Sequence, residues 1–167
     1  MEELVPVEQP SLEAYRDEAA ELSRALLSEL TFARRQAVAA FLGDALPPPP
    51  ARLYLAHGDL GAEHMFVART PRRITGVIDW SDTAVADPAL DLGLIMRDLG
   101  VDGFQHALTG FAAGGGDVVE AVPRAHFYAR VRALEDLSFG LEQDAPAYRD
   151  NALRAVDELM IDGLGKT

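Results

Sequence analysis

The chain has 167 residues, of which 49% are hydrophobic and 25% charged, a composition typical of a globular protein with a buried core. Its net charge of −12 argues against nucleic acids and anionic membranes as partners and favours a cationic small molecule, unless the acidity serves only solubility. The chain has no cysteine, which excludes disulfides and thiolate metal sites, and it has neither a membrane-spanning apolar run nor a secretory signal, so we expect a cytoplasmic protein.

Two helices are predicted before a proline-rich segment. The first covers residues 12–30, with Ser11 as its N-cap and a leucine-rich face that repeats at helical spacing. The second covers residues 32–42, with Thr31 as its N-cap. We expect Gly43 just beyond the C-terminus of the second helix, where glycine commonly ends helices.

The middle of the chain indicates β-structure. The tetraproline run cannot be helical, so residues 46–51 are expected to form a linker. Three short apolar stretches that are typical of strands follow it, at residues 53–56, 64–68 and 73–80. A turn at residues 70–72 joins the last two, which predicts a small β hairpin.

The rest of the chain is expected to be helical. Asp87 and Pro88 form a helix start signal, and Pro123 predicts an early kink in the third of the helices, which are expected at residues 90–99, 104–112, 118–141 and 147–164. The fold class is therefore α+β and mostly helical. We expect a single domain over residues 1–167, consisting of leading helices (1–45), the proline-rich linker (46–51), a strand and loop region (52–87) and a helical subdomain (88–167).

A motif with the spacing of a catalytic loop lies between the first two predicted strands. In "HGDLGAEH", His57, Asp59 and His64 follow the spacing of the protein-kinase catalytic loop, in which the last position is Asn. The Asp of that loop accepts the proton of the substrate hydroxyl, and the Asn holds a metal ion. Asp79 ends the third strand, at the place of the kinase aspartate that holds Mg²⁺. Because a hairpin would fold Asp79 back beside the loop, we expect two carboxylates to flank one site.

The two motifs together resemble the aminoglycoside phosphotransferase family, whose members include choline-kinase-like proteins. The resemblance lies in "HGDLGAEHMFV" and "GVIDWSDTAVADPALDLG", which cover residues 57–93. It implies a protein-kinase-like C-terminal lobe in which the small hairpin carries the catalytic and metal loops. The residues before the linker are predicted to be helical, the chain has no glycine-rich nucleotide loop, and its only lysine is Lys166. We therefore expect the N-terminal nucleotide lobe to be absent, and to come from a separate chain, a neighbouring subunit or a removed portion.

The resemblance also implies roles for individual residues. The catalytic set would be Asp59, the base, with His57, whose hydrogen bonds would hold the loop. The metal set would be Asp79, a Mg²⁺ ligand, with His64, which stands where most members have Asn. A half-buried histidine at a strand start is the alternative reading of His64. Two further acidic residues would cap a helix and brace the loop, Asp87 and Asp91.

The implied function is that of a small-molecule kinase. Such a transferase would move the γ-phosphoryl group of ATP or GTP, bound with Mg²⁺, to a hydroxyl of a cationic acceptor, as in antibiotic resistance. Aminoglycosides, macrolides, choline-like amines and sugars all stay open as acceptors. One alternative is an inactive stand-alone C-lobe that binds small molecules or proteins, and another is a hydrolase with one metal ion held by His57, Asp59, His64 and Asp79. Apolar surface left by the absent lobe predicts self-association into a homo-oligomer.

Overall fold

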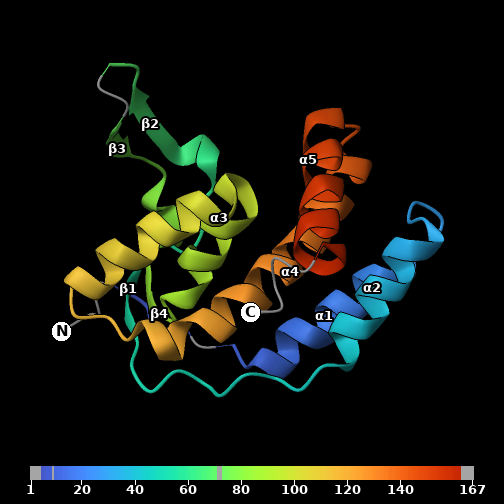
Figure 1. Cartoon of the computed structure of the whole chain (residues 1–167), viewed down its shortest axis with the longest axis horizontal. Coiled ribbons are helices and arrows are strands. Elements are labelled where there is room, and N and C mark those ends of the chain that lie inside the picture. The colour runs from blue at the N-terminus through green and yellow to red at the C-terminus, as the bar shows by residue number, and fades with distance from the viewer. Residues whose placement is uncertain (1–4, 9, 71–72, 163–167) are drawn as a thin grey trace. The chain divides into compact units, whose positions relative to one another are not determined.

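The chain folds into short strands and longer helices (Figure 1). The structure, a computed structural model, describes residues 5–8, 10–70 and 73–162. It divides into two compact units, residues 1–9 with 50–125 and residues 10–49 with 126–167. Most of the described residues are helical, and the strands form two two-stranded sheets, which confirms the mostly helical α+β prediction. Among the helices of the described ranges, none is both long and apolar enough to cross a bilayer.

The first unit contains both sheets. β1 (Tyr54–Ala56) pairs antiparallel with β4 (Ala84–Ala86), with Leu55 opposite Val85. β2 (Met65–Ala68) and β3 (Arg73–Val77) form the predicted antiparallel hairpin. β4, which has three residues, is not predicted from the sequence. This strand is instead defined by its pairing with β1 and by a parallel bridge from Val7 to Val85.

The longest helix of the first unit is α3 (Ala89–Ala113), which begins directly after the predicted start signal. Asp87 Oδ1 accepts a hydrogen bond from the Ala89 N–H at 3.0 Å. Where two separate helices are predicted, the structure has one element with a break at Gly100, whose φ of 66° suits a residue without Cβ. In Figure 1 the β2–β3 hairpin extends away from α3. Residues 118–125 of α4 (Val118–Glu142) also belong to this unit.

The second unit has only helices as regular secondary structure in its described residues. It contains α1 (Leu12–Ala25), α2 (Phe32–Gly43), the rest of α4, α5 (Pro146–Val156) and the π-helical segment η3 (Asp157–Ile161). The predicted caps of α1 and α2 are confirmed. Ser11 Oγ accepts from the Ala14 N–H at 3.2 Å, and Thr31 Oγ1 accepts from the Arg34 N–H at 3.4 Å.

Several predicted element ends are wrong. α1 ends at Ala25 and not at residue 30, and the residues after it form a turn. Leu26 and Leu30 are nevertheless buried, so the leucine pattern continues beyond the helix. Gly43 is the last residue of α2 rather than the position beyond it. The three predicted strands are each shorter than expected, as β1, β2 and β3 show. The predicted hairpin turn and the predicted end of the last helix include residues 71–72 and 163–164, which lie outside the described residues.

A buried ion pair joins the start of α3 to α4 within the first unit. Arg124 Nε donates to Asp87 Oδ2 at 2.7 Å, and the two side chains are only 2% and 7% exposed, respectively. The same carboxylate also accepts the Ala89 N–H. Because a buried charge without its partner is costly, this pair constrains the position at which α3 begins.

Replacing Asp87 tests the contribution of this pair to stability. In Asp87→Asn the side chain can still accept the Ala89 N–H, but Arg124 loses a buried counter-charge. We expect the free energy of unfolding, measured by urea denaturation, to fall by about 3 kcal/mol. The control is Asp150→Asn, whose ion pair with Arg149 is largely exposed, so its effect should stay below about 0.5 kcal/mol. Equal losses in the two variants would contradict the prediction.

Candidate functional site

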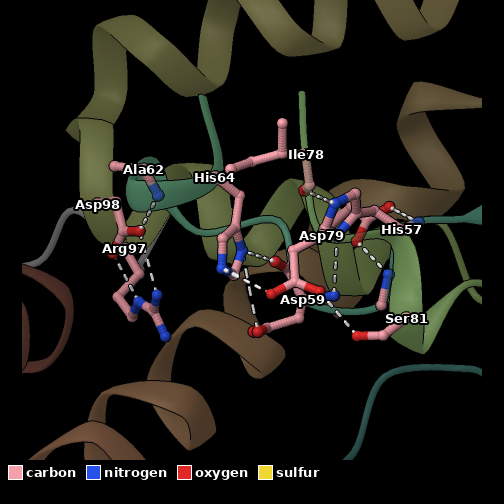
Figure 2. A network of polar contacts seen from close by, with 11 residues as sticks. His57, Asp59, Ala62, His64, Ile78, Asp79, Ser81, Arg97 and Asp98 are labelled. Atoms are coloured by element: carbon pink, nitrogen blue, oxygen red, sulfur yellow. Dashed lines mark hydrogen bonds and ion pairs between the residues drawn. The ribbon is translucent and has the colours of Figure 1, made fainter. Parts of the chain in front are cut away.

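Four residues predicted to form the site lie close together in the first unit. His57 and Asp59 follow β1, His64 is the last residue of η1 (Ala62–His64), and Asp79 lies between β3 and η2 (Trp80–Asp82). The His64 imidazole lies between the two carboxylates, with Nδ1 3.9 Å from Asp59 Oδ2 and Nε2 3.8 Å from Asp79 Oδ2 (Figure 2). The hairpin therefore brings together two acidic side chains from segments 20 residues apart, as predicted.

Both carboxylates are accessible from solvent. The side chains of Asp59 and Asp79 are 52% and 56% exposed, while that of His64 is 16% exposed. Within the described parts of the chain, no arginine forms an ion pair with either carboxylate. Their oxygens can therefore reach a ligand, which a carboxylate enclosed in an arginine pair could not do.

The backbone of Asp79 adopts an unusual conformation. Its φ of 62° and ψ of 61° lie in the left-handed region, which non-glycine residues seldom occupy and aspartate tolerates better than most. The Ser81 hydroxyl donates to Asp79 Oδ1 at 2.9 Å, so one carboxylate oxygen is held from its own loop. The other oxygen, Oδ2, faces His64. Backbone conformations of this kind are concentrated at functional sites, which supports Asp79 as a residue of the functional site.

His57 is buried and has both ring nitrogens engaged. Nδ1 accepts the Asp59 N–H at 3.3 Å, so the proton is assigned to Nε2, which donates to the Ile78 carbonyl oxygen at 2.9 Å. The ring also packs against Trp80, with centroids 4.8 Å apart. His57 therefore ties the loop to the end of β3 (Figure 2), and neither nitrogen is left to take a substrate proton or ligate a metal.

Asp91 braces the same loop from α3, in agreement with the resemblance. Its Oδ2 accepts the His57 N–H at 2.7 Å, and its Oδ1 accepts the Gly58 N–H at 3.0 Å. Burial raises the pKa of Asp91, while the two N–H donors act in the opposite direction by stabilising the ionised form. The carboxylate thus fixes the backbone immediately before Asp59.

Gly58 occupies a position that excludes a side chain. Its φ is 87°, and a Cβ built at this residue would lie 2.4 Å from the Asp82 carbonyl oxygen. Glycine is thus required twice, for the left-handed backbone and for the close approach of the two loops. This contact holds the loop that carries Asp59 against the loop that follows Asp79.

Two groups in the site were not identified from the sequence. Ser81, two residues after Asp79, is one of them, and no spacing argument singles out this serine. The other is the Arg97–Asp98 pair, in which Asp98 Oδ2 accepts the Ala62 N–H at 2.8 Å. The sequence does contain one feature that could have indicated Asp98. It follows Asp91 by seven residues, a spacing that places both side chains on one side of a helix.

The donor set suits a metal ion that arrives with a nucleotide. No group of three or more His, Asp or Glu side chains in the described residues could by itself hold a metal ion. Mg²⁺ typically takes one or two carboxylates and completes its shell with water and substrate phosphates. The exposed Asp79 carboxylate meets that need, so the residues fit such an ion. The four-residue metal site of the hydrolase alternative is not supported, because His57 has no free ring nitrogen.

A separate cavity in the first unit does not contain the site. It has a volume of about 640 Å³ and lies beside β1 and the start of α4, where Tyr54, Phe111 and Arg124 contribute to its lining. Asp59, His64 and Asp79 are not among its lining residues. The candidate site therefore lies outside this cavity.

Comparison with protein families and solved structures gives a consistent result. Residues 4–133 match the family described as the phosphotransferase enzyme family. A solved macrolide 2′-phosphotransferase from Brachybacterium faecium is 28% identical, with a TM-score of 0.56 over 92% of this chain and 52% of that one. A macrolide 2′-phosphotransferase type I is 25% identical, with a TM-score of 0.59 over 87% and 49%.

The fold alone is shared with a third structure, the GDP complex of an aminoglycoside 2′-phosphotransferase-IIIa. It is 20% identical, with a TM-score of 0.64 over 95% of this chain and 54% of that one. Among curated protein sequences, none matches this chain. The chain spans about half the length of the solved structures it resembles.

Gly58→Ala tests the close approach of the two loops. Because the new Cβ would meet the Asp82 carbonyl in a left-handed backbone, we expect the free energy of unfolding to fall by about 1–3 kcal/mol. The control is Gly110→Ala in α3, where a Cβ has nothing within 4 Å, and helix propensity should leave stability unchanged or raise it by up to about 1 kcal/mol. A Gly58→Ala variant as stable as the wild-type chain would contradict this packing.

His64 gives a prediction about pH. The hydrogen bond to the Asp59 carbonyl is the main cause that raises the pKa of His64, and nearby carboxylates, including that of Asp79, add to it against desolvation. Protonated His64 therefore stabilises the folded chain fully below the unfolded-state pKa, and this contribution is lost as pH rises through the folded-state pKa.

NMR titration of the His64 ring provides the measurement. We expect its pKa to lie above the ordinary histidine value in the folded chain. In Asp79→Asn it should fall only in part, since the Asp59 carbonyl remains. A pKa at or below the ordinary value in the wild-type chain would contradict the hydrogen bond from the ring to the Asp59 carbonyl and the position of the ring beside the two carboxylates.

Proposed function

This chain belongs to the phosphotransferase enzyme family, and we propose that it is the acceptor-binding, catalytic part of a small-molecule kinase. The reaction would be transfer of the γ-phosphoryl group of ATP or GTP to a hydroxyl of the acceptor. The observation that carries the proposal is the placing of His64 between Asp59 and Asp79, at 3.9 Å and 3.8 Å. Two exposed carboxylates thus lie beside one histidine, so that Asp59 can accept a proton while Asp79 binds a metal ion.

Asp59 is proposed to orient the acceptor hydroxyl and to take its proton as the new O–P bond forms and the nucleoside diphosphate leaves. Its backbone is held at both ends for this task. The Asp59 N–H donates to His57 Nδ1, and the Asp59 carbonyl accepts from the Gly61 N–H at 3.0 Å and from His64 Nδ1 at 2.7 Å. His57 acts here as a positioning residue, which refines its place in the predicted catalytic set.

Asp79 and His64 are proposed to hold the metal ion. Asp79 would contribute Oδ2, since Oδ1 accepts the Ser81 hydroxyl, and His64 would contribute Nε2 because Nδ1 donates to Asp59. An imidazole suits Mg²⁺ less well than the amide oxygen of Asn, so Asp79 is expected to be the main ligand. When bound with the nucleotide, Mg²⁺ supplies neutralisation of the phosphate charge.

The nucleotide-binding part is proposed to come from outside these 167 residues. A separate chain, a neighbouring subunit of a homo-oligomer or further residues of a longer protein could each provide it. The acceptor is proposed to be small and cationic, because the net charge of −12 favours such a ligand. Aminoglycosides, macrolides, choline-like amines and sugars are the classes to examine, with antibiotic resistance as one outcome, and a cytoplasmic location would supply the nucleotide.

A second candidate function is a binding module that holds small molecules or proteins without transferring phosphate. The observation in its favour is the lack of a glycine-rich nucleotide loop and of any lysine other than Lys166 in the sequence. A kinase lobe uses such groups to hold nucleotide phosphates. The exposed and precisely held Asp59 and Asp79 favour the kinase instead, since a passive binder has no chemical need for both.

The test is transfer of a labelled γ-phosphoryl group by this chain together with its proposed nucleotide-binding part. ATP or GTP is supplied with Mg²⁺, and an aminoglycoside, a macrolide and choline serve as acceptors. For an acceptor that is phosphorylated, we expect Asp59→Asn to lower the rate by about 10²–10⁴-fold, because the base is lost, while nucleotide affinity stays unchanged.

Asp102→Asn is the matched control, since this aspartate is exposed on α3, beyond the break at Gly100. The control should transfer phosphate at the wild-type rate. Transfer that survives Asp59→Asn would refute the role of Asp59. Ligand binding without transfer to any acceptor would favour the binding module.

A further inference from the structure

We propose that Asp98 is a second positioning residue for the loop of residues 57–64, holding the end opposite to the one that Asp91 holds. The inference rests on the proposed function, because the loop it positions carries Asp59 and His64. The carboxylates of Asp91 and Asp98 do not touch the reacting groups. Each of them accepts hydrogen bonds from backbone N–H groups of the loop. The site would therefore be set by two fixed points on one helix.

The contacts of Asp98 are short and directional. Its Oδ2 accepts the Ala62 N–H at 2.8 Å. Arg97 Nε donates to Asp98 Oδ1 at 2.7 Å, and a second guanidinium nitrogen donates to Oδ2 at 3.1 Å, so the carboxylate is held in a two-pronged arrangement (Figure 2). The Arg97 and Asp98 side chains are only 8% and 18% exposed. Such a pair has little freedom to rotate away from the loop.

Ala62 is the residue for which such an acceptor matters. It is the first residue of η1, and N–H groups at the start of a helix have no partner within the helix. Gly61, which precedes it, has no side chain to cap the turn. Asp98 supplies the missing acceptor from α3. Because η1 ends at His64, fixing its first N–H also fixes the turn that presents the imidazole.

The spacing on α3 matches the spacing of the loop. Asp91 and Asp98 are seven residues apart, which places them on one side of the helix and about 10 Å apart along its axis. The loop residues that they hold, Gly58 and Ala62, are separated by a segment that could span up to about 14 Å if fully extended. Asp59 lies between the two anchors, so its backbone can shift little without breaking one of them.

The structure also offers a reason for the site of the break in α3. Gly100, where the helical geometry is interrupted, follows Asp98 by two residues. The helix is thus regular over the stretch that carries both anchors and changes direction only after the second one. Asp91 and Asp98 can hold the two ends of the loop at a constant separation only if the helix between them is unbroken.

Amide hydrogen exchange, measured by NMR on the full chain, tests the anchor without any assay of activity. In Asp98→Ala we expect the Ala62 and His64 amides to exchange about tenfold faster or more, while the His57 and Gly58 amides keep their protection through Asp91. Asp98→Asn, which keeps an acceptor oxygen, should retain most of the protection. Asp102→Ala, four residues further along α3 and beyond the break at Gly100, should leave all four amides unchanged.

Kinetics with an acceptor that the wild-type chain phosphorylates provide the second readout. Displacement of Asp59 should lower kcat by about 10–100-fold in Asp98→Ala with little change in the acceptor KM, and Asp98→Asn should recover most of the rate. This pattern would support positioning, because a general loss of structure would also remove the protection at His57 and Gly58.

Two results would overturn the inference. One is unchanged protection of the Ala62 amide in Asp98→Ala. The other is an equal loss of protection throughout the chain, which would make Asp98 a residue of general stability. If the wild-type chain transfers no phosphate when its nucleotide-binding part is supplied, the proposed function fails, whereas the exchange experiment on the chain alone still decides whether Asp98 anchors the loop.

Discussion

The hydrogen bonds from the His57 and Gly58 backbone to the half-buried Asp91 carboxylate are the constraint on which the site depends. They join a loop to a helix, and a loop alone would not hold a side chain in one place. Burial of Asp91 disfavours its ionised form and raises its pKa, and the two N–H donors offset part of this cost. The carboxylate and the loop backbone therefore stabilise each other, and Asp59 follows directly from this fixed point.

The strands of the first unit are too short to hold the site by themselves. β1 and β4 have three residues each, and β2 has four. Side-chain anchors from outside the sheets supply the missing order: Asp91 from α3, the His57 ring between the loop and Ile78, and the close contact of Gly58 with Asp82. The strands give the loops their direction, and these anchors set the position of the reactive groups.

The electrostatics of the site follow from the same arrangement. His64 donates to the Asp59 carbonyl and lies between two carboxylates, which is why its pKa is raised. Asp59 and Asp79 stay exposed because their carboxylates face this histidine and solvent rather than an arginine. In the first unit Arg97 forms an ion pair with Asp98, and Arg124 forms one with Asp87. These two arginines therefore neutralise carboxylates that hold the fold together. This distribution leaves the two central carboxylates exposed.

Much of the site could be predicted from the sequence because its chemistry is local in the chain. The spacing of His57, Asp59 and His64, and the position of Asp79 at the end of a strand, need only a short motif and a hairpin. The family that they indicated is confirmed by the match over residues 4–133, and the mostly helical fold with its hairpin is confirmed by the structure. The roles of the four residues remain proposals, as does the single domain, for which the structure describes two compact units.

The sequence by itself determined the residue types, their order and the caps Ser11 and Thr31, because these depend on neighbours a few residues away. Only the tertiary structure decided that β4 exists, that Asp98 reaches Ala62 and that His57 has no free nitrogen. Each of these depends on partners more than 20 residues away or on the choice of a hydrogen-bonding partner, and no local pattern encodes such a distance or orientation.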